Sequence, residues 1–168
     1  QKADAMPAAE IARFEKWIKS GARFDGADPR LPLAEILAPV EHPAAPAAYA
    51  TALPVTALAF SPDGAELAVS GYREVTIWNP TTGALVRRIG NVAPRTVALA
   101  FSPDGKTLAV AGGQPGESGE LRLFNPATGA LQRLLFATSD MVLDVKFSGD
   151  GKLIAAACVD GSIRIFSA

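Results

Sequence analysis

The sequence has 168 residues, of which 49% are hydrophobic and 20% charged, so it can form one ordinary domain with an apolar core and part of another. Its formal net charge of -1 provides no charge excess for binding nucleic acid or anionic lipid. No apolar run approaches the roughly 20 residues of a membrane-spanning helix. The single cysteine, Cys158, has no partner for an internal disulfide.

Residues 6–26, "MPAAEIARFEKWIKSGARFDG", predict one amphipathic helix. Apolar residues recur at helical spacing between Ile11 and Ile18. Pro7 suits the first helical turn, and Gly21 suits the C-terminal end.

The same segment resembles the last helix of small c-type cytochrome domains. The resemblance implies that residues 1–30 are the C-terminal remnant of such a domain, and that Met6 supplies the sixth ligand to the iron of haem c in the intact parent protein. It also implies a periplasmic or other extracytoplasmic location. Since the sequence has no Cys-x-x-Cys-His motif, we expect no covalently attached haem in this chain alone.

The next segment, residues 31–54, is predicted to be a linker. Its second half, "APVEHPAAPAAYATALP" (38–54), is rich in alanine and proline and has no period, a composition typical of a semi-rigid spacer. His42, the only histidine, is expected to be solvated there.

From residue 55 onward, three segments align without gaps: "VTALAFSPDGAELAV" (55–69), "TVALAFSPDGKTLAV" (96–110) and "VLDVKFSGDGKLIAA" (142–156). Phe60, Phe101 and Phe147 lie 41 and 46 residues apart. We assign the extra residues to "GGQPGESGE" (112–120), whose composition predicts a lengthened turn. The repeat is the strongest signal in the sequence.

Each repeat predicts short antiparallel strands. Alternating residues such as Leu143, Val145 and Phe147 share one face of a first strand. "SPDG" is a turn, since proline presets φ, aspartate is favoured and glycine accepts positive φ. Second strands are expected at 67–71, 108–112 and 153–158, third strands at 74–78, 120–124 and 162–166, and fourth strands after the Pro/Gly turns that begin at 79 and 125.

Four strands recurring every 40 to 45 residues are typical of a propeller blade. "FSPDG", "TIW" and "TTGALVRRI" resemble the blades of WD-repeat β-propellers, which in planctomycete-type bacteria are fused to cytochrome domains of the kind described above. Trp78-Asn79 stands where the family usually has Trp-Asp, and the Gly-His pair before the first strand is absent. The buried Asp-His-Ser-Trp network of the family is therefore mostly missing, and we expect apolar packing to stabilise the blades.

The predicted fold is mainly β: a partial β-propeller of two complete four-stranded blades and one incomplete blade over 55–168, with one N-terminal α-helix. Since propellers close with four to eight blades, we expect the chain to be part of a longer protein. The remaining blades of that parent would cover the apolar faces of the first and third blades.

Four loop residues are predicted to contact protein partners. Tyr72 and Arg73 combine an aromatic ring and a cation before a third strand, a combination common at interfaces. Gln114 and Glu117 lie in the 112–120 insertion, and longer loops are where propellers carry binding function. Cys158 is expected to pack rather than react, and we assign no catalytic residue and no metal ligand.

The leading hypothesis is a non-catalytic scaffold that binds protein partners through its propeller loops and is linked, in the parent, to an electron-transfer cytochrome. Two alternatives are a propeller enzyme of the hydrolase or dehydrogenase type and a purely structural spacer. The first strands supply no histidine for a catalytic metal in a central channel.

Overall fold

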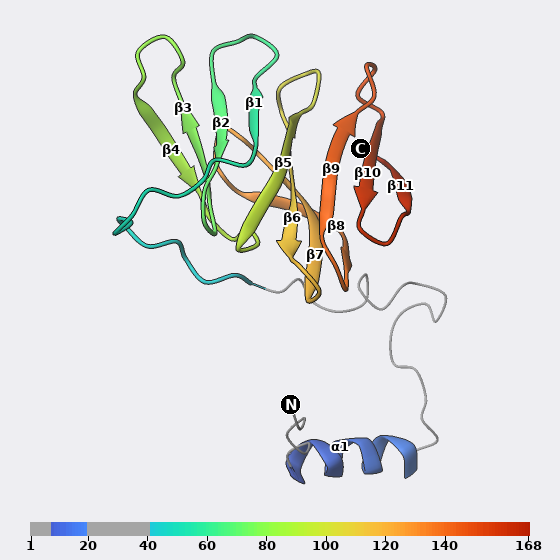
Figure 1. Cartoon of the computed structure of the whole chain (residues 1–168). Coiled ribbons are helices and arrows are strands. Elements are labelled where there is room, and N and C mark those ends of the chain that lie inside the picture. The colour runs from blue at the N-terminus through green and yellow to red at the C-terminus, as the bar shows by residue number, and fades with distance from the viewer. Residues whose placement is uncertain (1–7, 20–40) are drawn as a thin grey trace. The chain divides into compact units, whose positions relative to one another are not determined.

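The computed structural model describes residues 8–19 and 41–168. The chain divides into two compact units, Gln1–Ile36 and Leu37–Ala168, and each is described by itself. In the first unit, helix α1 covers Ala8–Lys19 (Figure 1). The predicted helix is confirmed over these residues, while its expected ends, Met6 among them, lie outside the described residues.

The second unit contains three antiparallel sheets, each built from strands consecutive in the chain (Figure 1). Blade 1 comprises β1 (Leu58–Phe60), β2 (Leu67–Ser70), β3 (Val75–Trp78) and β4 (Leu85–Ile89). Blade 2 comprises β5 (Arg95–Phe101), β6 (Leu108–Gln114), β7 (Ser118–Phe124) and β8 (Leu131–Thr138). Blade 3 comprises β9 (Val142–Phe147), β10 (Leu153–Cys158) and β11 (Ile163–Ser167). The predicted partial propeller of two complete blades and one incomplete blade is confirmed.

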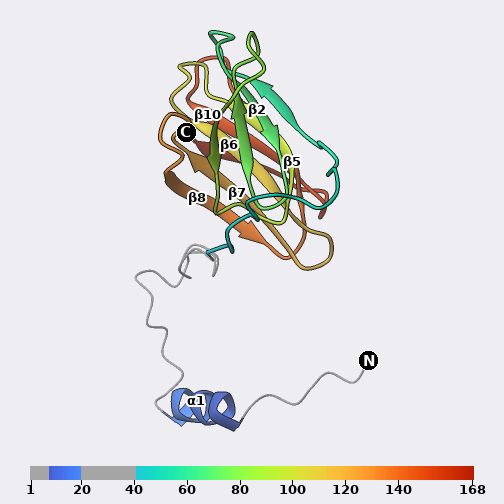
Figure 2. The same cartoon turned by 90° about the vertical axis from the view of Figure 1, so that its left-hand side faces the viewer.

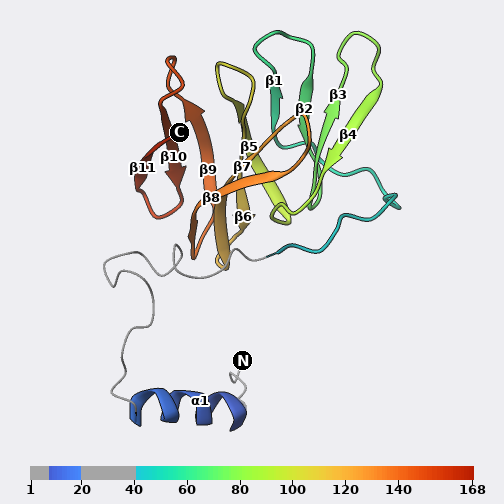
Figure 3. The ribbon, with the colours of Figure 1, turned by 180° about the vertical axis from the view of Figure 1, so that it is seen from behind.

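The blades stack face to face in chain order, as the front and back views show (Figures 1 and 3). One apolar core lies between blades 1 and 2, where Val75 and Ile77 pack with Leu99 and Leu108. A second core lies between blades 2 and 3 and includes Leu121 and Val145. Full burial of each such side chain contributes about 1.5–3 kcal/mol, so the stack is held mainly by apolar packing.

The exposure of equivalent residues shows that stacking, and not the strand itself, decides burial. On the face directed toward the preceding blade, equivalent side chains of blades 1, 2 and 3 are 60%, 6% and 0% exposed (Leu58, Leu99 and Val145). On the opposite face the order is reversed, at 0%, 0% and 75% (Val75, Leu121 and Ile163). The end blades therefore present apolar faces to water, as predicted.

The repeated "SPDG" turn has the same geometry in all three blades. In blade 2, the Ser102 hydroxyl donates to Asp104 Oδ1 at 2.6 Å and accepts the backbone N–H of Thr107 at 3.0 Å. The equivalent bonds recur at Ser61 and Ser148. The serine, to which the sequence analysis assigned no role, is thus the side chain that closes the turn.

The repeated turns also lie close to one another across the blade boundaries. A Cβ atom added at Gly105 would lie 3.6 Å from Pro62 Cδ of the preceding turn, and one at Gly151 would lie 3.4 Å from Pro103 Cδ. In the third copy Gly149 replaces the proline, and a Cβ there would meet no atom within 4 Å among the described residues. The five-residue repeat therefore serves both the reversal of the chain and the stacking of blades.

The prediction of a lengthened turn over 112–120 is wrong. Strands β6 and β7 continue into this segment and pair Gly112 with Glu120 and Gln114 with Ser118, which leaves only residues 115–117 as the turn. Glycine permits this because the backbones pack closely: a Cβ at Gly112 would lie 1.9 Å from the carbonyl oxygen of Arg95. The insertion therefore lengthens a hairpin instead of loosening a loop.

Candidate functional site

The candidate site is a cavity of about 620 Å³ between blades 1 and 2, at the end of the stack that carries the β2–β3, β4–β5 and β6–β7 connections. This end, the loop end, is the lower one in Figure 1. The apolar part of the wall includes Leu53, Pro54, Pro94, Val97 and Pro115. Polar groups are supplied by Thr56, Tyr72, Arg95, Thr96 and Gln114. Apolar walls with a few polar groups are typical of binding cavities.

Two of the four predicted contact residues, Tyr72 and Gln114, line this cavity from different blades. Arg73 has a positive φ of 60° and places its guanidinium carbon 5.2 Å from the centre of the Tyr72 ring. Glu117 lies in the 115–117 turn, where its N–H donates to the carbonyl of Gln114 at 3.0 Å. The structure thus gathers all four residues around one end of blades 1 and 2, while their role in binding stays a prediction.

Sequence reasoning missed Arg95, which connects the two blades at this place. It forms an isolated antiparallel bridge with Tyr72, so the backbones of the two blades are joined beside the cavity. The sequence carries no local signal for this contact, because Tyr72 and Arg95 belong to different repeats and meet only when the blades stack.

A polar network lies next to the cavity, at the start of β1. Ser70, 4% exposed, accepts the backbone N–H groups of Thr56 at 2.9 Å and of Ala57 at 3.0 Å. The Thr56 hydroxyl lies 3.0 Å from Ser70 Oγ and also donates to the carbonyl of Thr96 in blade 2. These bonds connect the first two blades with polar contacts that the sequence analysis did not assign.

The predicted solvation of His42 is wrong, because the second half of the predicted linker is docked on the blades. His42 Nε2 lies 2.9 Å from Glu120 Oε1, and the two side chains are 14% and 12% exposed. The N–H of His42 also donates to Asn91 Oδ1 at 2.9 Å. Residues 41–57, which we call the arm, run along the loop end before they reach β1 (Figures 1 and 2). Alanine and proline composition predicts extension but does not reveal where an extended segment docks.

The arm caps equivalent glutamates in the first two blades. Glu74 of blade 1 accepts hydrogen bonds from Tyr49 of the arm and from Arg88, whose Nη2 lies 2.8 Å from Glu74 Oε1. Glu120, its equivalent in blade 2, is bonded by His42 and lies 2.8 Å from Arg122 Nε. A buried carboxylate is unfavourable without hydrogen-bond or ionic partners. The arm supplies such partners to Glu74 and Glu120, which the stacking of the blades removes from water.

Electrostatic effects at Glu74 follow from this arrangement. Burial by itself raises the pKa of Glu74, but the hydrogen bonds from Arg88 and Tyr49 outweigh burial and hold the pKa below its ordinary value. Burial, together with the bond to Glu74, raises the pKa of Tyr49. The carboxylate is therefore held ionised and the phenol neutral, the combination that preserves their hydrogen bond.

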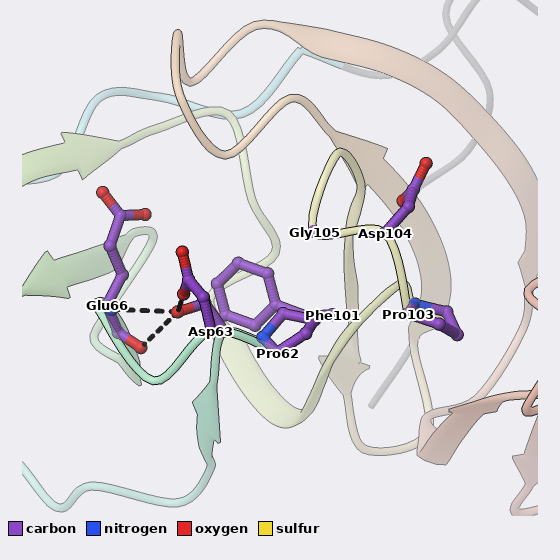
Figure 4. Close-up of a pocket in the computed structure, with 8 residues that line it drawn as sticks. Pro62, Asp63, Glu66, Phe101, Pro103, Asp104 and Gly105 are labelled. Atoms are coloured by element: carbon purple, nitrogen blue, oxygen red, sulfur yellow. Dashed lines mark hydrogen bonds between the residues drawn. The ribbon is translucent and has the colours of Figure 1, made fainter.

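A second cavity, of about 430 Å³, lies between the "SPDG" turns of blades 1 and 2 (Figure 4). Its carboxylates are already engaged, since Asp63 accepts from Ser61, and Glu66 pairs with Arg87 Nη1 at 2.7 Å. The equivalent seam between blades 2 and 3 encloses about 290 Å³. We attribute both to the repeated junction of neighbouring turns rather than to a site of individual chemistry.

Within residues 8–19 and 41–168, no group of three or more His, Cys, Asp or Glu side chains is placed to hold a metal ion. In the part of the chain that the structure describes, no helix is both long enough and apolar enough to cross a membrane. Cys158 is a buried free cysteine in β10 that packs in the core between blades 2 and 3.

Stacked antiparallel sheets of consecutive strands define a partial β-propeller. A family model described as "WD domain, G-beta repeat" matches residues 49–79 and 129–167. The first match covers the end of the arm and the first three strands of blade 1, and the second covers the outer strand of blade 2 with all of blade 3. Together with the three sheets, these matches support a WD-repeat β-propeller-like fragment and a protein-interaction scaffold role. A comparison with curated proteins found no match.

Proposed function

We propose that this chain is a non-catalytic interaction module whose loop end binds a protein partner. The observation that carries the proposal is the cavity shared by blades 1 and 2, which Tyr72 and Gln114 line from separate repeats. The exposed ring of Tyr72 and its stacked Arg73 supply the residue types that dominate binding energy at protein interfaces.

The arm supports this proposal because it is part of the cavity wall. Leu53, Pro54 and Thr56 belong to the arm, and the Tyr49 hydroxyl donates to the carbonyl of Tyr72 at 2.9 Å. Hydrogen bonds at His42 and Tyr49 hold the arm against both blades. A wall fixed in this way loses little conformational entropy when a partner binds, which favours affinity.

Site-specific photo-crosslinking tests the proposal. A photoreactive phenylalanine analogue at Tyr72 or Gln114 is expected to crosslink a protein partner in an extract of the organism that encodes the chain. Sequencing of the crosslinked peptides then identifies that partner. The same analogue at Val86, which is 46% exposed on β4, is the matched control. Absence of crosslinks at the loop end, or the same products from Val86, would favour a structural spacer.

We further propose that, in the parent protein, the module follows an extracytoplasmic haem-binding cytochrome c domain. The support is the resemblance of residues 6–26, with Met6 as the proposed axial ligand. This chain's own residues do not fit covalent haem: Cys158 is buried in β10, and the ring of His42 is engaged by Glu120. Haem absorbance of a chain extended upstream tests the proposal, and an upstream sequence without Cys-x-x-Cys-His would contradict it.

A further inference from the structure

The cavity at the loop end has a distinct charge pattern. Three arginines elsewhere in blades 1 and 2 pair with carboxylates: Arg87 with Glu66, Arg88 with Glu74 and Arg122 with Glu120. Arg95, which is exposed and lines the cavity, forms no ion pair with any residue in the described ranges. Since no carboxylate of the described residues pairs with it, the Arg95 guanidinium is available for an anion that comes from outside the chain.

A second guanidinium belongs to Arg73, the residue that follows Tyr72. Arg73 stacks on the ring of Tyr72, and Tyr72 is bridged through its backbone to Arg95. Arg73 likewise has no carboxylate partner in the part of the chain that the structure describes. The 115–117 turn carries Glu117, and Asp140 accepts the N–H of its Gly116 at 3.1 Å, but neither carboxylate forms an ion pair with Arg95 or Arg73. Guanidinium groups bind carboxylates through paired hydrogen bonds, so a carboxylate is the complementary ligand group.

One polar group of the wall lacks a partner among the described residues, but it does not face the cavity. Thr96 lines the wall, is 1% exposed, and its hydroxyl has no hydrogen-bond partner among the described residues. Buried hydroxyl groups without a partner are uncommon and costly. The hydroxyl oxygen exposes less than 1 Å², so a ligand in the cavity does not reach it.

The remaining wall is largely apolar, which disfavours a wholly charged ligand. Leu53, Pro54, Pro94 and Pro115 give the cavity an apolar surface, and its volume of about 620 Å³ lies in the range of cavities that enclose small ligands. A bulky apolar side chain would remove this surface from water. These features together describe an apolar slot whose wall carries Arg95, a guanidinium without an ionic partner in the described residues.

We propose that the loop-end cavity binds an extended peptide of a protein partner, in which a bulky apolar side chain fills the slot and a neighbouring Asp or Glu carboxylate pairs with Arg95 and Arg73. This inference rests on the proposed interaction function and specifies the chemistry of the partner. Tyr72 forms the boundary between the apolar and the charged part of the contact.

Selection from a random nonapeptide library on the full-length chain, followed by fluorescence anisotropy of the enriched peptides, tests the inference. We expect enriched sequences to contain Asp or Glu next to a bulky apolar residue, and replacement of either residue to weaken binding at least tenfold. Arg95→Glu is expected to weaken binding at least tenfold as well, and a peptide with Lys in place of the acid is expected to restore part of it.

Two control variants separate this contact from general effects. Arg133→Glu changes the charge by the same amount at an exposed position of β8 and should leave peptide affinity within twofold. Thr96→Val should leave peptide affinity within twofold, because the hydroxyl exposes less than 1 Å², and its unfolding midpoint should stay the same or rise, because the hydroxyl has no partner in the described chain. Circular dichroism of each variant confirms that the fold is retained.

The outcomes distinguish this inference from the function on which it rests. No enrichment, peptides without an acid, or equal losses in Arg95→Glu and Arg133→Glu would overturn the inference. If partner crosslinks at Tyr72 persist in that case, the interaction function survives with a different partner chemistry. If the crosslinks are absent too, both proposals fail.

Discussion

Equivalent leucines in blades 1 and 2 provide a direct test of the stacked arrangement. Leu58 and Leu99 occupy the same position of the repeat on β1 and β5, but their side chains are 60% and 6% exposed. Replacement of a buried leucine by alanine costs about 2–5 kcal/mol, because it removes transfer free energy and leaves a cavity. The same replacement at an exposed position costs about 0.5 kcal/mol or less. Leu99→Ala should therefore destabilise the chain by several times more than Leu58→Ala.

Urea unfolding of the full chain, followed by circular dichroism, measures this difference. Both variants remove the same atoms from the same type of strand, so the local strand preference cancels in the comparison. Equal losses of unfolding free energy would refute the stacking of blade 1 on blade 2 as the source of burial. In a longer parent chain, a preceding blade on the free face should raise the cost of Leu58→Ala toward that of Leu99→Ala.

Three further predictions concern the turns and the arm. Ser102→Ala should lower the free energy of unfolding by about 1–2 kcal/mol, and Ser148→Ala should lower it less. Both variants lose the same turn bonds, but Ser102 is buried, whereas water can replace the bonds at Ser148. Urea unfolding of the two variants measures the difference. Tyr49→Phe removes the hydrogen bonds to Glu74 and to the Tyr72 carbonyl. It should therefore increase hydrogen exchange and protease cleavage in residues 41–57 and leave both unchanged in blades 2 and 3. Unchanged protection of the arm would contradict its docking. The serine hydrogen bond lowers the pKa of the turn aspartates, such as Asp104, so the native state binds fewer protons than the unfolded state. Their stabilisation should be complete above about pH 4 and disappear as pH falls through the lowered native pKa, and a urea midpoint that does not change over this interval would contradict the assignment.

Much of the local structure of this protein, apart from the hairpin at 112–120, can be predicted from its sequence alone. Strand alternation and the Pro, Asp and Gly of "SPDG" act through neighbouring residues, so the eleven strands of the described blades and their antiparallel order followed from the repeat. The Ser102 hydroxyl also acts locally, but its role required knowing which backbone N–H groups the turn leaves without partners.

How the repeats pack into a stack of blades, and which side chains this packing buries, depends on the tertiary structure. Leu58 and Leu99 have the same neighbours in the sequence, and only stacking buries one and leaves the other in water. The bridge between Tyr72 and Arg95 and the docking of His42 on Glu120 both depend on contacts between segments far apart in the chain. Such contacts leave no periodic trace in the sequence, because one side chain meets one partner once, whereas a strand or a turn imposes its pattern on every residue it contains.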